Sequence, residues 1–143
     1  MKKLLLIGII LSICAFACKT SKKSANADSN TPLYETQWML TAIDGQPVGD
    51  APAQPFIKFK SDGNVSGKLG CNDFFGSYFV KKDKMSVEYK GSTKKLCSNM
   101  DVENAFAAAL KKDISNYAIV GDELILRVKD QEVLRFKAAP KTE

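Results

Sequence analysis

The fold is decided by residues 56–69, FIKFKSDGNVSGKL. Apolar side chains recur in the two arms of this stretch at the two-residue period of a strand that buries one face. The SDGN between the arms combines the residues that favour a tight reversal of the chain. The stretch therefore predicts an antiparallel hairpin.

The same alternation continues along the rest of the chain, on both sides of this hairpin. Short turns rich in Gly, Asp and Lys separate the alternating segments, which favours antiparallel neighbours. Strands are expected at residues 36–43, 56–60, 65–69, 78–80, 85–89, 117–120, 124–128 and 133–136.

One segment breaks the strand pattern. Residues 101–112, DVENAFAAALKK, have apolar side chains at helical spacing, acids in the expected first turn and lysines in the expected last turn. This charge order complements the helix dipole, and Ser98 or Asn99 is expected to cap the helix. The sequence therefore predicts an α+β domain, in which about seven or eight short antiparallel strands form a strongly curved half-barrel around one main helix.

Residues 1–17 indicate a signal peptide. Two lysines precede an apolar run at 4–16 that is too short to span a bilayer comfortably. Cys18 directly follows Ala-Phe-Ala, as in a bacterial lipobox, where the cysteine receives lipid and becomes the new N-terminus. Cys14 fits this pattern less well, because a bulky isoleucine precedes it. Plain secretion by cleavage after Ala17 is the alternative.

The next segment has the composition of a tether. Residues 19–33, KTSKKSANADSNTPL, are rich in Ser, Asn, Ala and Lys without periodicity. We therefore expect a lipidated cysteine and flexible tether at 18–33, a folded domain at 34–138 and a short tail at 139–143. Because Lys19, and not Asp, follows the lipidated cysteine, the outer membrane is favoured over the inner one.

The folded domain is nearly neutral. The chain has 21 basic and 16 acidic residues, and residues 1–33 contain five lysines and one aspartate, which leaves 16 basic and 15 acidic residues. Nucleic-acid binding requires a basic face, so no nucleic-acid partner is expected. The membrane, through the lipid on Cys18, is an expected partner.

The chain contains no histidine. Ser-His-Asp and Cys-His nucleophile systems and all His-ligated metal sites are thereby excluded. Cys71 and Cys97 remain in the exported domain and predict a disulfide, with two reduced buried thiols as the alternative. Two cysteines alone are too few for a structural zinc site.

The acids carry no distinctive pattern either. Asp101 with Glu103 could in principle act as an acid–base pair, and Asp122 with Glu123 could contribute to a metal site. Nothing in the sequence distinguishes them from ordinary surface acids. No catalytic residue, metal site or cofactor is therefore predicted.

Four elements together resemble one family. GCNDFFGSY at 70–78 resembles the G-C-N-x-[FY]-x-G-x-Y signature of the META/HslJ family, and TKKLC at 93–97 resembles its T-x-x-x-C element. The helix carries its E-x-x-F-x-x-x-L pattern, and Trp38-x-Leu40 matches its opening strand. The elements lie in the family's order and cover nearly all of the domain. The signature positions are Gly70, Asn72, Asp73, Gly76, Tyr78, Thr93 and Glu103.

The resemblance implies a small α+β domain, often on an envelope lipoprotein, and no established catalytic activity. Members of the family are linked with heat shock, antibiotic tolerance and secretion or motility. In physical terms, Gly70 and Gly76 are expected at sharp turns, and Asn72 is expected to bond its own turn. The alternative is a polar cluster of Asn72, Asp73 and Thr93 beside the cysteines that contacts a ligand.

Three function hypotheses follow. The leading one is a non-catalytic, stress-related envelope lipoprotein whose monomeric domain stabilises or escorts another envelope protein. The second is a binding module for an apolar or lipidic small ligand held between sheet and helix. An envelope hydrolase without histidine is the weakest.

Overall fold

The structure, a computed structural model, describes residues 31–140. The expected signal peptide, Cys14, the expected lipidation site Cys18 and most of the expected tether lie outside the described residues. The described chain forms nine strands and one helix, with these bounds: β1 Gln37–Ile43, β2 Gln46–Pro47, β3 Phe56–Phe59, β4 Asn64–Lys68, β5 Asp73–Lys81, β6 Lys84–Ser92, α1 Asp101–Leu110, β7 Asn116–Val120, β8 Glu123–Val128 and β9 Gln131–Ala138.

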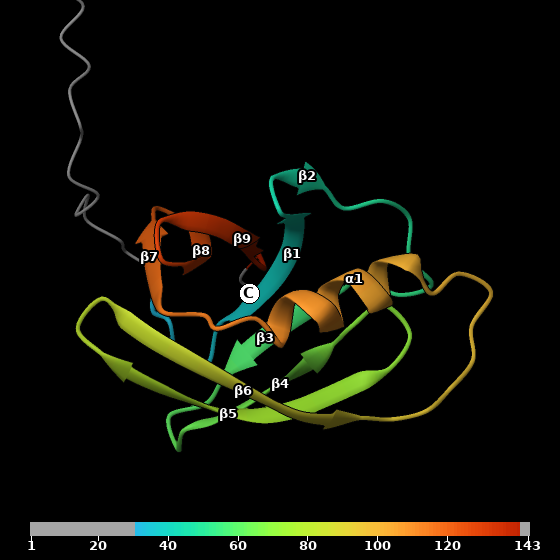
Figure 1. The fold of residues 1–143 in the computed structure, drawn as a ribbon, viewed down its shortest axis with the longest axis horizontal. Helices are drawn as coiled ribbons and strands as arrows, with labels where there is room; N and C mark the ends of the chain where they lie inside the picture. The colour runs from blue at the N-terminus through green and yellow to red at the C-terminus, as the bar shows by residue number, and fades with distance from the viewer. Residues whose placement is uncertain (1–30, 141–143) are drawn as a thin grey trace, which may run out of the picture.

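All nine strands belong to one antiparallel sheet that curves into a ring (Figure 1). The order is β2-β1-β3-β4-β5-β6-β7-β8-β9, and β1 also pairs with β9. The expected α+β class and strong curvature are confirmed. The ring closes further than the expected half-barrel, because β1 and β9 pair from Trp38–Ala138 to Ile43–Leu134. The additional strand is β2, which consists of two residues beside β1.

The ring has one weak seam. Strands β6 and β7 pair only at Lys84 and Asn116, and α1 lies between them in the sequence. The helix packs against both β1 and β6, which are on opposite sides of the ring. It therefore lies across one mouth of the ring and closes the interior where the strands do not (Figure 1).

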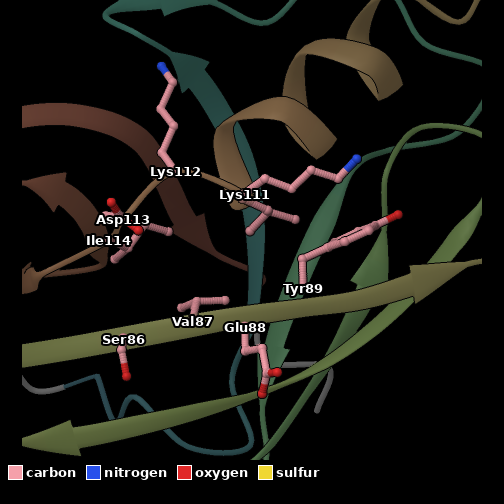
Figure 2. Close-up of a pocket in the computed structure, with 9 residues that line it drawn as sticks. Ser86, Val87, Glu88, Tyr89, Lys111, Lys112, Asp113 and Ile114 are labelled. Atoms are coloured by element: carbon pink, nitrogen blue, oxygen red, sulfur yellow. The ribbon is translucent and has the colours of Figure 1, made fainter.

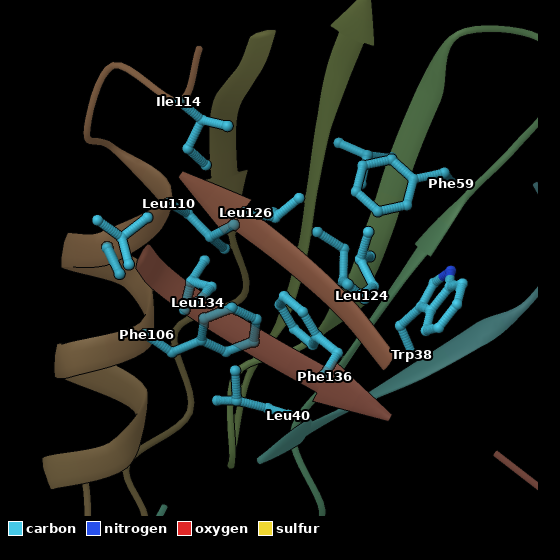
Figure 3. Close-up of a cluster of buried hydrophobic side chains, with 14 of the residues drawn as sticks. Trp38, Leu40, Phe59, Phe106, Leu110, Ile114, Leu124, Leu126, Leu134 and Phe136 are labelled. Atoms are coloured by element: carbon cyan, nitrogen blue, oxygen red, sulfur yellow. The ribbon is translucent and has the colours of Figure 1, made fainter. Parts of the chain in front are cut away.

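Aromatic side chains fill the interior between the ring and the helix (Figure 3). Trp38, Phe59, Phe106 and Phe136 have no exposed surface. The ring of Phe106, from the helix, lies 5.9 Å from those of Phe74 and Phe136, measured between centroids. The place expected for an apolar ligand is therefore occupied by the protein's own side chains.

The helix is shorter than expected. It ends at Leu110, so Lys111 and Lys112 follow the last turn and do not belong to it. Their amide N–H groups bond the carbonyls three residues earlier, which tightens the chain and ends the helix. Neither Ser98 nor Asn99 is the residue directly before the helix, because that residue is Met100, whose side chain makes no capping bond. Asn99 still contributes, since its side-chain oxygen accepts the N–H of Asp101 at 3.0 Å.

The N-terminal side of the domain is tied to the core before β1. Leu33, the last residue of the expected tether, is buried. The indole N–H of Trp38 donates to the carbonyl of Leu33 at 3.1 Å. Within residues 31–140, no helix combines the length and the apolar character needed to cross a membrane.

Candidate functional site

Most of the signature positions meet at one corner of the domain. The connection at residues 70–72 between β4 and β5, the loop that follows β6 and the first turn of α1 come together there. We call Asn72, Thr93 and Glu103 the signature cluster. Asn72 is 2% exposed and Glu103 is 7% exposed, so the cluster brings an amide and a carboxylate into the interior.

The carboxylate of Glu103 binds the connection before β5. Its Oε2 accepts the backbone N–H of Cys71 at 3.0 Å and that of Asn72 at 2.7 Å. Its Oε1 accepts the side-chain amide of Asn72 at 2.6 Å. Three donors therefore surround one carboxylate, which is the arrangement that offsets the cost of burying it.

Asn72 joins the helix to the loop after β6. Its Nδ2 also donates to the carbonyl of Lys95 at 2.9 Å, and its Oδ1 accepts the N–H of Lys95 and the hydroxyl of Thr93, both at 2.7 Å. The expectation that Asn72 bonds its own turn is wrong. Its side chain instead bonds residues more than 20 positions away, because the fold brings two separate segments against it.

Asp73 lies outside the cluster, although its backbone N–H bonds Thr93 Oγ1 at 3.2 Å. Its exposed carboxylate pairs with Lys68 Nζ at 2.6 Å. The hydrogen bond from Lys68 lowers the pKa of the Asp73 carboxyl below its usual value. Of the three residues expected to form a polar cluster, Asn72 and Thr93 do so and Asp73 does not. The carboxylate in the cluster is that of the buried Glu103.

Cys71 and Cys97 form a disulfide beside the cluster, with Cα atoms 6.2 Å apart. The bond joins the connection before β5 to the loop after β6. Asn72 already joins the same two segments by hydrogen bonds. The loop after β6 is therefore held against the connection before β5 by a covalent bond and by hydrogen bonds.

The two signature glycines have different roles. Gly70 has φ +137°, a conformation that L side chains rarely adopt, so its expected turn role holds. Gly76 is not in a turn but inside β5, at an irregularity of the pairing with β6. A Cβ there would lie 2.1 Å from the carbonyl oxygen of Glu88. The close approach of two strands, and not a turn, requires this glycine.

Tyr78 packs against the core from the same strand. Its ring lies 4.9 Å from that of Phe59, and its hydroxyl donates to the carbonyl of Lys60 at 2.5 Å. Burial of the phenol, aided by nearby Tyr34 and Asp62, raises the pKa of Tyr78 to about 12. Tyr78 therefore ties β5 to the turn after β3.

The other candidate acids are engaged at the surface. Asp122 lies 3.4 Å from Lys137 Nζ, and Glu123 lies 2.8 Å from an Arg135 guanidinium nitrogen. Asp101 is exposed at the start of α1. Among residues 31–140, no group of three or more metal-ligating side chains is placed to hold an ion.

A surface groove of about 330 Å³ lies beside the seam of the ring, between β6 and the segment that follows α1. Figure 2 shows Tyr89 below Lys111, whose Nζ is 5.1 Å from the ring centroid. Lys112 is engaged by Asp44 at 2.7 Å. The lining of the groove is mixed in polarity and charge, and no pattern in the sequence indicates the groove because its residues come from two separated segments.

The signature cluster is internally complete. In the described part of the chain, every buried side-chain nitrogen and oxygen has a hydrogen-bond partner. A site built for a substrate keeps donors or acceptors available for it, whereas this cluster uses its own to join three segments. The arrangement can hold a fold and a loop in place.

Comparison with known proteins agrees with this architecture. The structure is similar to the NMR structure of a protein from Burkholderia xenovorans, with TM-score 0.60 and 22% identity over 83% of this chain and 99% of that one. It is also similar to a second protein solved by NMR, with TM-score 0.53 and 24% identity over 71% of this chain and 87% of that one. At these identities the likeness shows the fold alone.

No curated protein matches the sequence significantly. The family model of the META domain matches residues 31–141, which include the ring, the helix and the signature cluster. The META domain is a small bacterial domain and is not a known enzyme family. This chain belongs to the META domain family.

Proposed function

We propose that this protein is a non-catalytic, lipid-anchored protein of the bacterial envelope whose META domain binds and stabilises another envelope component. The observation that carries the proposal is the signature cluster. Glu103, Asn72 and Thr93 satisfy one another and the backbone, so the family's polar residues act as supports. A scaffold whose buried polar side chains are already paired with one another, as they are in residues 31–140, suits binding better than catalysis.

The N-terminal sequence supports the envelope location. Cys18 follows Ala-Phe-Ala at the end of an apolar run, and a segment rich in Ser, Asn and Lys separates it from the folded domain. A flexible tether of this length has a typical reach of about 20 Å. The domain would therefore stay close to the membrane while it contacts a partner.

Membrane attachment is tested by Cys18→Ala in the full chain. Fractionation should move the protein from the membrane pellet to the soluble fraction and abolish labelling by a palmitate analogue. Cys14→Ala is the matched control, and it should leave both results unchanged. Continued labelling of the Cys18→Ala protein would contradict the lipid anchor. Separation of the two membranes on a density gradient should place the wild type in the outer one.

The binding role is tested by photo-crosslinking in cells that express the full chain. A photoreactive residue is placed, one at a time, at exposed apolar positions around the ring, including Phe75, Phe79 and Val120. At least one exposed position should yield a discrete protein adduct, which should also form under heat stress. Absence of adducts from every position would overturn the binding role.

A further inference from the structure

The loop between β6 and α1 carries the most exposed of the large apolar side chains that the structure describes. Leu96 is 93% exposed, against 66% for Phe79 and 57% for Phe75. Figure 1 shows this loop, in amber, reaching beyond the ring at the end of the long axis. An exposed leucine is unremarkable by itself. Leu96 differs from an ordinary exposed leucine in that the residues on both sides of it are held to the domain.

Every second residue of the loop is tied to the body of the domain. Thr93 bonds Asn72 Oδ1 through its hydroxyl, and Lys95 bonds the Asn72 side chain through both its N–H and its carbonyl. Cys97 is joined to Cys71 by the disulfide. Asn99 donates from Nδ2 to the carbonyl of Asp50 at 3.1 Å.

The loop lies at the surface, where the tied residues Thr93, Lys95 and Asn99 are exposed as well as the residues between them. Lys94, Leu96 and Ser98 are all exposed, and Leu96 has a tied residue on either side of it. The backbone is therefore held at both neighbours of Leu96. The signature cluster and the disulfide hold Leu96 in one place, although its side chain contributes almost nothing to the core.

Such a segment is organised for binding before a partner arrives. Ordering a mobile loop on association opposes binding, and this loop is already ordered by folding. A few side chains that fill pockets near the centre of an interface supply most of its binding energy. Leu96 has the exposure and the fixed position that this role requires.

Two lysines define the chemistry around Leu96. Lys94 and Lys95 are exposed, and within residues 31–140 neither has a carboxylate within 4 Å of its ammonium group. The neighbouring Asp73 is occupied by Lys68. The loop thus offers one exposed apolar side chain directly preceded in the chain by two exposed lysines, which complements an apolar pocket with carboxylates at its rim.

We propose that the 93–99 loop is the docking site of a protein partner that provides an apolar pocket rimmed by acidic residues. The proposal rests on the binding role proposed above and places that role on the molecule. A protein is favoured over the membrane surface as the occupant. In Figure 1 the blue segment through which the chain enters β1 lies in the left half of the view, whereas the loop is at the right-hand end. The point at which the tether joins the domain is therefore distant from the loop, which favours a protein over the membrane surface as the occupant.

The test uses the full chain in cells, with benzoylphenylalanine at position 96 in one strain and at position 79 in another. Position 96 should give one discrete protein adduct. Combining the probe with Lys94→Glu and Lys95→Glu should reduce the adduct about tenfold.

The captured protein is then purified and titrated with the lipidated chain in detergent. Leu96→Ser should weaken its binding by at least about tenfold, and added salt should weaken the wild type.

Phe79→Ser is the matched control, because Phe79 is exposed on β5 and distant from the loop. It should change the affinity less than about twofold, and Leu96→Ser should leave the melting temperature unchanged because the side chain is exposed. Wild-type affinity in Leu96→Ser, or adducts of position 96 with lipid alone, would overturn the docking site. Adducts from other positions without any from 96 would overturn it while the binding role stands. No adduct from any position would overturn both.

Discussion

Glu103, in the first turn of α1, holds Asn72 by both its backbone and its side chain. The backbone N–H of Asn72 lies 2.7 Å from Glu103 Oε2, and the side-chain amide lies 2.6 Å from Oε1. The two residues are 31 positions apart in the chain. A single carboxylate therefore fixes the start of β5 relative to the helix that closes the ring.

This relationship predicts that Glu103→Gln destabilises the fold. Glutamine keeps one acceptor oxygen, so its NH2 group must face either the backbone N–H groups of Cys71 and Asn72 or the side-chain amide of Asn72. In both orientations a buried donor is left without an acceptor. The expected loss in the free energy of unfolding is about 1–3 kcal/mol. Urea unfolding followed by circular dichroism measures it.

Asp101→Asn is the matched control for this change. Asp101 lies in the same first turn but is exposed, so its amide should alter the unfolding free energy by no more than about 0.5 kcal/mol. Equal stability of Glu103→Gln and Asp101→Asn would show that the buried carboxylate does not hold the corner.

The disulfide predicts a second loss of stability. Replacing both Cys71 and Cys97 by serine releases a cross-link that spans 26 positions. The chain-entropy argument gives a loss of about 2–4 kcal/mol, which lowers the melting temperature by several degrees or more. Differential scanning calorimetry of the wild type and the double variant checks this.

The state of the two cysteines is measured separately. Protein purified from the envelope is denatured without reductant, treated with an alkylating reagent and weighed by mass spectrometry. No alkylation of Cys71 and Cys97 is expected before reduction, and two additions are expected after it. Two additions before reduction would support the alternative of buried, reduced thiols.

Gly76 predicts a loss that depends on contact between strands. In Gly76→Ala the added methyl group would meet the carbonyl oxygen of Glu88 at 2.1 Å. Because that atom belongs to the backbone of β6, the strands must separate, which costs about 1–3 kcal/mol. Gly49→Ala is the control, since nothing lies within 4 Å of its added Cβ. Similar urea midpoints for both variants would contradict the close approach.

The elements that the sequence predicts well are those with a local signal. The hairpin of β3 and β4 and the helix α1 follow from periodicity and turn residues within a dozen positions. The strand expected at 78–80 begins earlier, at Asp73, in the structure. Its start does not follow from a hydrophobicity pattern, because the inward-facing Gly76 has no side chain and hides the alternation of Phe74, Gly76 and Tyr78.

Contacts between distant segments could not be predicted in the same way. The pairing of Trp38 with Ala138, which closes the ring, depends on strands at opposite ends of the domain. The burial of Glu103 is equally non-local, since its partners Cys71 and Asn72 precede it by more than 30 positions. An acid in the first turn of a helix is normally explained by the helix dipole. For Glu103, only its position in the family pattern indicates another role.

Tyr78 predicts a specific dependence of stability on pH. The pKa of its phenol is about 12 in the folded protein, above the usual 10.0. Between these values the folded state keeps a proton that the unfolded chain has lost, so stability falls as the pH rises through this window. The stabilisation from the protonated phenol is fully present below about pH 10. It is lost as the pH approaches about 12.

Tyr78→Phe isolates this contribution. At neutral pH the variant lacks the hydrogen bond to the carbonyl of Lys60 and should be less stable by about 1 kcal/mol. Its stability lacks the phenol titration, so the difference from the wild type should shrink as the pH rises from about 10 towards 12. Urea unfolding at matched pH values measures the difference, and lysine titration affects both proteins alike. A constant difference across this range would show that Tyr78 ionises as easily in the folded protein as in the unfolded chain, and that its contact with Phe59 and Lys60 does not protect the phenol.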